Sequence, residues 1–150
     1  MKVERTKRLD EQDHRSLVLW AADCAEHVLP FFEEKHPQDD RPRKALEAGR
    51  AWARGEIACG KARAAAFAAH AAALAADEGA ARAAARAAGH AAATAHMAGH
   101  ARHAAAYAIK AVIAAGTDSA TERDWQCRRL PEHLRPVVFP PSRHYEDFAA

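Results

Sequence analysis

The chain of 150 residues has few large aliphatic side chains, and alanine supplies more than half of its 49% hydrophobic content. A shortage of large aliphatic residues accompanies disorder when the net charge is high, but the formal net charge here is +2. Alanine has the highest helix propensity, because its side chain loses no entropy on folding. We therefore expect an ordered all-α protein, forming a single helical domain over residues 1–150.

Cysteine pairs and long apolar runs are also missing. Cys24, Cys59 and Cys127 are far apart and form no CxxC motif, which argues against a disulfide framework and a zinc knuckle. The N-terminal stretch MKVERTKRLDEQDH is charged throughout and has no apolar signal-peptide region. Arginines and histidines interrupt the alanine-rich run, which makes it a poor membrane span. These absences predict a cytoplasmic protein that does not engage a membrane.

Apolar spacing and capping residues predict a compact bundle of about five helices with close packing along alanine and glycine. The predicted helices cover residues 11–29, 41–54, 60–77, 80–115 and 118–129. The fourth is much longer than the roughly 11–12 residues of an average helix, so a bend at Gly89 or Gly99 would be no surprise. Proline-rich residues 131–150 predict an extended C-terminal strap, with Val137, Val138 and Phe139 held against the bundle.

The fourth predicted helix contains RAAGHAAATAHMAGHARHAAAYAIK, residues 86–110, which carries four histidines. On a continuous helix, His96, His100 and His103 occupy positions i, i+4 and i+7 of one stripe, and His90 stands about a third of a turn away. Each glycine in this run costs about 1 kcal/mol relative to alanine, which favours close approach of another backbone. We therefore expect the stripe to face another helix or a narrow groove rather than open water.

The imidazoles admit four interpretations. The leading one makes them neutral, half-buried wedges, hydrogen-bonded across the gap between thin helices. The second makes them part of a contact surface for a partner. The third is metal binding by His96, His100 and His103, although residues 79–117 contain no Asp or Glu to complete such a site. The last is acid–base catalysis. We assign no metal ligand, cofactor or catalytic residue.

The acid-free span of residues 79–117 also carries four cations, which are Arg82, Arg86, Arg102 and Lys110. Four cations over this length are sparse for a nucleic-acid surface, so nucleic-acid binding is not favoured. We expect these cations to pair with acidic residues of the first two helices. Those acids are Glu26, Glu33, Glu34 and Glu47.

The segment DDRPRKALEAGRAWARGEI is dense in charge at the start of the second predicted helix. A helix cap followed by a solvated face accounts for it, with Asp39 or Asp40 as the N-cap. The alternative is an adaptable polar contact patch made of Asp40, Arg41 and Arg43.

Residues 55–61, GEIACGK, fit most of a phosphate-binding P-loop, but Ala62 stands where the motif needs a hydroxyl. A helical pattern precedes the motif, where a P-loop needs a strand. We therefore interpret the segment as a connector between helices and reject nucleotide hydrolysis. No Ser–His–Asp arrangement can be assembled either, and we expect no enzyme.

Three segments resemble a family of small bacterial proteins described as immunity proteins, similar to the type-five immunity proteins of polymorphic toxin systems. The segments are CAEHVLPFFEEKHPQDDRPRKALEAGRAWARGEI (24–57), RAAGHAAATAHMAGHARHAAAYA (86–108) and WQCRRLPEHLRP (125–136). The resemblance implies an all-helical cytoplasmic protein that binds and neutralises a cognate toxin. It carries over six positions of the family motif, which are Asp40, Arg41, Pro42, His90, His96 and His100.

The resulting hypothesis is a non-enzymatic interaction protein. Its candidate binding residues are Asp40, Arg41, Arg43, His90, His96, His100 and His103. Immunity proteins against nucleases often carry an acid surplus that attracts a basic toxin, and this chain lacks one, which argues against a nuclease but not against a toxin of another class. The alternative is a metal- or small-ligand-binding helical protein that uses the histidine stripe. The identity of the toxin and the formation of a homo-oligomer are left open.

Overall fold

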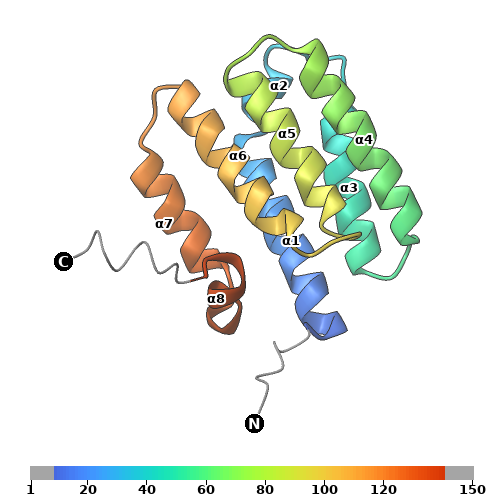
Figure 1. Cartoon of the computed structure of the whole chain (residues 1–150). Coiled ribbons are helices and arrows are strands. Elements are labelled where there is room, and N and C mark those ends of the chain that lie inside the picture. The colour runs from blue at the N-terminus through green and yellow to red at the C-terminus, as the bar shows by residue number, and fades with distance from the viewer. Residues whose placement is uncertain (1–8, 141–150) are drawn as a thin grey trace, which may run out of the picture.

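The computed structural model of the chain describes residues 9–140, and its regular structure in this range is entirely helical (Figure 1). The elements, in chain order, are α1 (Glu11–Val28), α2 (Pro30–Glu33), α3 (Arg41–Ala53), α4 (Cys59–Ala75), α5 (Ala80–Ala93), α6 (His100–Ala114), α7 (Ser119–Arg129), the 3-10 helix η1 (Glu132–Leu134) and α8 (Arg135–Val138). The all-α prediction is confirmed. Four of the predicted ranges agree with α1, α3, α4 and α7 to within two residues at each end.

The prediction of about five helices is wrong, because residues 9–140 contain eight α-helices. Two of the additional ones are the four-residue helices α2 and α8. Each has a proline in its first turn, where the missing N–H costs nothing. The third comes from a break in the long predicted helix.

The break lies at residues 94–99, between α5 and α6. Thr94 caps the end of α5, and its hydroxyl Oγ1 donates a hydrogen bond of 2.8 Å to the carbonyl oxygen of His90. Gly99 is the N-cap of α6. A single straight helix over 80–115 would extend about 50 Å and leave its alanine faces without partners. Folding back places α6 beside α5, so that both helices bury those faces (Figure 1).

α5 is the central helix of the bundle. It lies between α4 and α6, and α1, α2 and α3 also pack against it (Figure 1). Its buried residues are eight alanines and Gly89, which confirms the expected packing along small side chains. The residues of α5 that remain partly accessible include Arg82, Arg86 and His90, spaced four residues apart, so they form one stripe along the helix.

α7 is attached to the bundle by two buried hydrogen bonds. Trp20 Nε1 of α1 donates to the carbonyl oxygen of Gln126 at 2.8 Å, and Gln126 Nε2 donates to the carbonyl oxygen of Ala105 on α6 at 3.0 Å. Both polar side chains are nearly inaccessible to solvent, so these bonds satisfy groups that would otherwise be costly to bury. They fix α7 against both α1 and α6.

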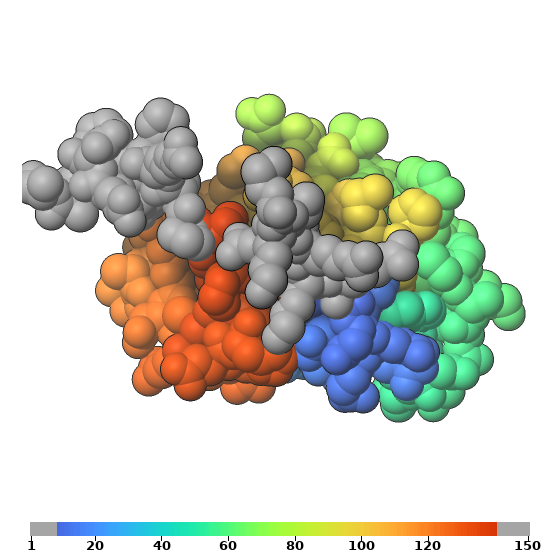
Figure 2. All heavy atoms as spheres, turned by 60° about the horizontal axis from the view of Figure 1, so that its bottom comes forward, coloured from blue at the N-terminus to red at the C-terminus, as the bar shows by residue number. Residues whose placement is uncertain are grey.

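The segment after α7 differs from the predicted extended strap. Residues 132–138 are helical, and Val138 is buried as expected, whereas Val137 and Phe139 are partly exposed. Figure 2 shows this segment next to the start of α1, where His133 Nε2 lies 2.8 Å from Asp13 Oδ1. Residues 141–150 of the predicted strap lie outside the described residues.

None of the helices within residues 9–140 combines the length and apolar character that a membrane crossing requires. The P-loop-like segment of residues 55–61 connects α3 to the first turn of α4, and Gly55 turns the chain with φ of +76°. The interpretation of this segment as a connector between helices is therefore confirmed.

Candidate functional site

Four histidines and a tyrosine meet on the face formed by α4, α5 and α6. We define this histidine cluster as His70, His90, His100, His103 and Tyr107. His90 is at its centre, with its ring centroid 4.9 Å from that of His70 and 5.3 Å from those of His100 and His103. It stacks on Tyr107 at 5.2 Å with an interplanar angle of 11°. The break at 94–99 brings His90 across from α6, so the predicted separation of His90 from the stripe is wrong.

Gly89 makes room for His70, a member of the cluster that the sequence analysis did not identify. A Cβ atom at position 89 would lie 2.6 Å from His70 Cε1, which is too close for van der Waals contact. The expected approach of another backbone is therefore replaced by the approach of an imidazole ring. Among the described residues, a Cβ added at Gly99 would have no heavy atom within 4 Å apart from its chain neighbours, so close packing does not require a glycine there.

His90, at the centre of the cluster, is uncharged near pH 7. Burial lowers the pKa of His90 to about 3, and the positive charges of Arg86 and of the other three histidines add to this effect. Burial also lowers the pKa of His70 and of His100. Arg86 Nη1 donates a hydrogen bond of 3.1 Å to His70 Nδ1, and the Nδ1 atoms of His90 and His100 are 3.2 Å apart.

The expectation that the whole stripe is covered is wrong for His96 and His103, whose side chains are exposed. His96 lies in the turn between α5 and α6, with its Nδ1 atom 4.0 Å from Cys59 Sγ. It therefore does not continue the helical face of His100 and His103. In residues 9–140, no three His, Cys, Asp or Glu side chains are arranged to hold a metal ion. This geometry gives no support to the metal-binding alternative.

The predicted patch of Asp40, Arg41 and Arg43 lies at the start of α3. Arg41 donates hydrogen bonds of 2.9 and 2.7 Å to the carboxylate of Asp39, and Asp40 pairs with Lys44 at 3.1 Å. Pro42 is in the first turn, as expected. The patch borders an open hollow of about 480 Å³, but no described hydrogen bond or aromatic contact joins it to the histidine cluster. The predicted site residues thus form separate groups.

Arg43 of the patch is part of an ion-pair network. Arg43 binds the carboxylates of Glu33 and Glu26, and Arg50 binds Glu26 at 2.9 Å and Asp23 at 3.0 Å. Hydrogen bonds and the positive charges of Arg50 and Arg43 hold the pKa of Glu26 below its ordinary value. The expected pairing with the cations of residues 79–117 is therefore wrong for Glu26 and Glu33, because α3 supplies their partners.

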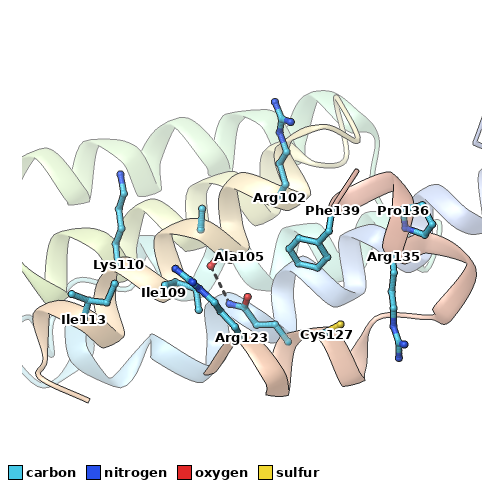
Figure 3. A pocket seen from close by; sticks show the side chains of 12 residues that line it. Arg102, Ala105, Ile109, Lys110, Ile113, Arg123, Cys127, Arg135, Pro136 and Phe139 are labelled. Atoms are coloured by element: carbon cyan, nitrogen blue, oxygen red, sulfur yellow. Dashed lines mark hydrogen bonds between the residues drawn. The ribbon is translucent and has the colours of Figure 1, made fainter. Parts of the chain in front are cut away.

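A groove that the sequence analysis did not predict lies between α6, α7 and α8 (Figure 3). Its volume is about 1010 Å³. We define this apolar groove by its twelve lining residues, which are Arg102, Ala105, Ala106, Ile109, Lys110, Ile113, Arg123, Gln126, Cys127, Arg135, Pro136 and Phe139. Four of the twelve are cationic and none is acidic, so the groove combines an apolar lining with a positive rim.

α6 contributes a regular stripe to this groove. Its lining residues are Arg102, Ala105, Ala106, Ile109, Lys110 and Ile113. The alternating steps of three and one residues are typical of a helix face that packs against another helix. This spacing is visible in the sequence, but an uninterrupted helix over 80–115 gives no reason to choose this stripe over the histidine stripe.

The fold and these surfaces define an all-helical protein whose described candidate sites are surfaces and a groove rather than an assembled catalytic centre. A family model described as "Imm-5 like putative immunity protein" matches residues 7–133, so the chain belongs to that family of immunity proteins. The resemblance inferred from the three sequence segments is thereby confirmed. Comparison with curated proteins gave no match, and neither did comparison with solved structures.

Proposed function

We propose that this protein binds a cognate toxin and neutralises it by covering a functional surface, without catalysing a reaction. The observation that carries the proposal is membership of the immunity family across most of the chain. An immunity protein of this kind needs a stable scaffold and an exposed surface complementary to the toxin. The alanine-packed bundle supplies the first, and the histidine cluster, the patch at α3 and the apolar groove are candidates for the second.

The chemistry of the cysteines supports a non-enzymatic role. Burial raises the pKa of the Cys24 thiol well above its ordinary value, so that thiol stays protonated and unreactive. Cys59 is closer to a base, but its Sγ atom is 4.0 Å from His96 Nδ1. Among the described residues, no third group is hydrogen-bonded to His96 to orient its ring, as a nucleophile–base pair requires.

The proposal is tested by expressing the toxin candidate encoded beside this gene, alone and together with this protein, in a bacterial host. We expect growth arrest by the candidate alone and restored growth on co-expression. The purified proteins should form a one-to-one complex by size-exclusion chromatography with light scattering. Continued growth arrest together with no complex, while the protein is folded by circular dichroism, would reject the proposal for that toxin.

Charge reversal tests whether the patch at α3 takes part. Arg41→Glu and Arg43→Glu should each weaken binding to the toxin, and Lys61→Glu, at an exposed position of α4 outside the patch, is the matched control. Because Arg43 also binds Glu26 and Glu33, its variant must first be shown to remain folded. Unchanged affinity and unchanged growth protection in both folded variants would remove the patch from the interface.

A further inference from the structure

The cations around the apolar groove differ from those at α3, because no described residue forms an ion pair with them. Within residues 9–140, the ion pairs of the protein include Arg41, Arg43, Lys44 and Arg50, but none of the four groove cations. The groove cations are Arg102, Lys110, Arg123 and Arg135. The Nε atom of Arg135 is also the one buried side-chain nitrogen or oxygen among the described residues without a hydrogen-bond partner. This surface therefore has positive charge for which the described chain supplies no counter-charge.

The lining between these cations is apolar and partly open to solvent. Ile113 is 56% exposed and Phe139 is 46% exposed, although both have large hydrophobic side chains. In Figure 3, Phe139, which follows α8, faces α6, while Arg102 and Lys110 extend from α6. Exposed apolar area bordered by charged residues is typical of a surface that binds another protein.

The shape of the groove suits a helix. The stripe of α6 from Arg102 to Ile113 covers about three turns, or roughly 17 Å. Ala105 and Ala106 lie at its middle, and their small side chains let a second helix approach closely. An amphipathic helix placed there would bury its apolar face against Ile109, Ile113 and Phe139.

We propose that the apolar groove receives an amphipathic helix of the cognate toxin, with Asp or Glu residues flanking its apolar face. This inference rests on the proposed function and adds the location and the chemistry of the contact. The acidic flanks would pair with cations such as Arg102 and Arg123 on opposite sides of the groove, which fixes the orientation of the helix. A second copy of this chain fits less well, because a two-fold interface would set the same cations against one another.

Two native cysteines provide a test of the location. Cys127 lines the groove, whereas Cys59 begins α4 outside it, and both are partly accessible. With the toxin candidate at ten times its dissociation constant, alkylation of Cys127 by iodoacetamide should slow about tenfold, and that of Cys59 should not change. Mass spectrometry of the digested protein measures both rates in one sample. Slowed alkylation of Cys59 with unchanged Cys127 would overturn the inference.

A matched pair of substitutions tests the same contact without chemical labelling. Ala106→Trp places an indole in the groove, and Ala71→Trp places one on the exposed face of α4. The groove variant should bind the toxin candidate about 30-fold or more weakly, as expected for a blocked interface centre, and the α4 variant should bind normally. Circular dichroism confirms that both are folded. The reverse pattern would overturn the inference and place the contact on the face of α4.

Two further results separate this inference from its rivals. If residues 141–150 of the chain itself occupied the groove, a protein ending at Pro140 would show faster alkylation of Cys127 in the absence of toxin. That result would overturn the inference, and an unchanged rate would support it. Growth protection with full reactivity of Cys127 in the complex would reject the groove contact alone. Loss of both complex formation and protection in the unaltered protein would instead reject the proposed function together with this inference.

Discussion

Helices α1–α3 are held together by large side chains and ion pairs, whereas α4–α6 pack mainly through the methyl groups of alanine. Leu17, Trp20, Phe32 and Leu46 are buried in the first region. Every buried residue of α4 and α5 is alanine, except for Gly89. The same contrast holds for charge, because Arg43 and Arg50 have carboxylate partners and the groove cations of α6 have none among the described residues. The arginines of α3 therefore have their ion-pair partners within the first region. The second region presents cations and apolar surface that a partner protein could contact.

The largest expected effect comes from overfilling the alanine-packed region. Ala88 is fully buried on α5, so Ala88→Leu should lower the free energy of unfolding by about 1–3 kcal/mol. Ala71→Leu, on the exposed face of α4, should change it by less than about 0.5 kcal/mol. Urea unfolding followed by circular dichroism measures both values. If both substitutions changed the free energy of unfolding equally, the alanine-lined interface of α5 would accommodate a larger side chain without cost.

The ion pairs of the first region can be compared directly with the unpaired cations of the second. Arg50→Ala removes one cationic partner of both Asp23 and Glu26 and should lower the free energy of unfolding by about 1–2 kcal/mol. Arg102→Ala should change it by less than about 0.5 kcal/mol, since no described ion pair is lost. A loss of stability in Arg102→Ala as large as in Arg50→Ala would remove the contrast between the two regions.

The contact between Gly89 and His70 predicts that Gly89→Ala will change the free energy of unfolding in opposite directions with and without the His70 ring. In the natural sequence, Gly89→Ala should destabilise the protein by about 1 kcal/mol, because the new Cβ displaces the His70 ring and its hydrogen bond with Arg86. In a His70→Ala background, the same substitution should stabilise it by about 1 kcal/mol through helix propensity. A double-mutant cycle of unfolding free energies measures the coupling. If the effects of the two substitutions were additive, the His70 ring would not occupy the space left by the missing Cβ of Gly89.

The pH dependence of stability also distinguishes the two regions. His90 has a lowered pKa of about 3 in the fold, so the unfolded chain binds its proton more readily below its ordinary value of 6.5. The stabilisation is therefore complete above pH 6.5 and decreases as the pH falls from there toward 3. Glu26 has a lowered pKa as well, but its contribution is lost only as the pH falls below its ordinary value of 4.5.

Substitution of His90 should separate these two ranges. His90→Phe should flatten the decline in stability just below pH 6.5 and leave the decline below pH 4.5, which urea midpoints across this range will show. An unchanged profile between these two values would mean that His70 and His100, whose pKa values are also lowered, carry the dependence instead.

The sequence was sufficient to predict most helices, because their ends carry strong local signals. The ends of α1, α3 and α7 follow from a capping Asp, from proline in a first turn and from glycine after a last turn. The break at residues 94–99 has a weaker signal: Gly99, one of the two predicted bend positions, lies at its end, but Gly89 lies within α5 and no proline intervenes. Its cause is tertiary, as both alanine faces are buried only when the chain folds back.

The candidate sites were predictable only in part for the same reason. The sequence grouped His100 and His103 correctly, but it added His96 to their stripe and set His90 apart, because the arrangement across the helical hairpin depends on the break. His70 was missed because a lone histidine in an alanine-rich helix gives no indication of its neighbour. The groove was missed because two of its walls, α7 and α8, come from segments whose positions are set by tertiary contacts such as Trp20 with Gln126.

The His70 ring seated over Gly89 has a consequence for how α4 and α5 are aligned. A row of identical methyl groups looks the same after a shift of one helical turn, about 5.4 Å, so alanine alone specifies the sliding position of two helices poorly. A single ring that fits only where a side chain is missing removes that ambiguity. In this bundle, the contact of the His70 imidazole with Gly89 therefore selects one alignment of α4 and α5 among several nearly equivalent ones.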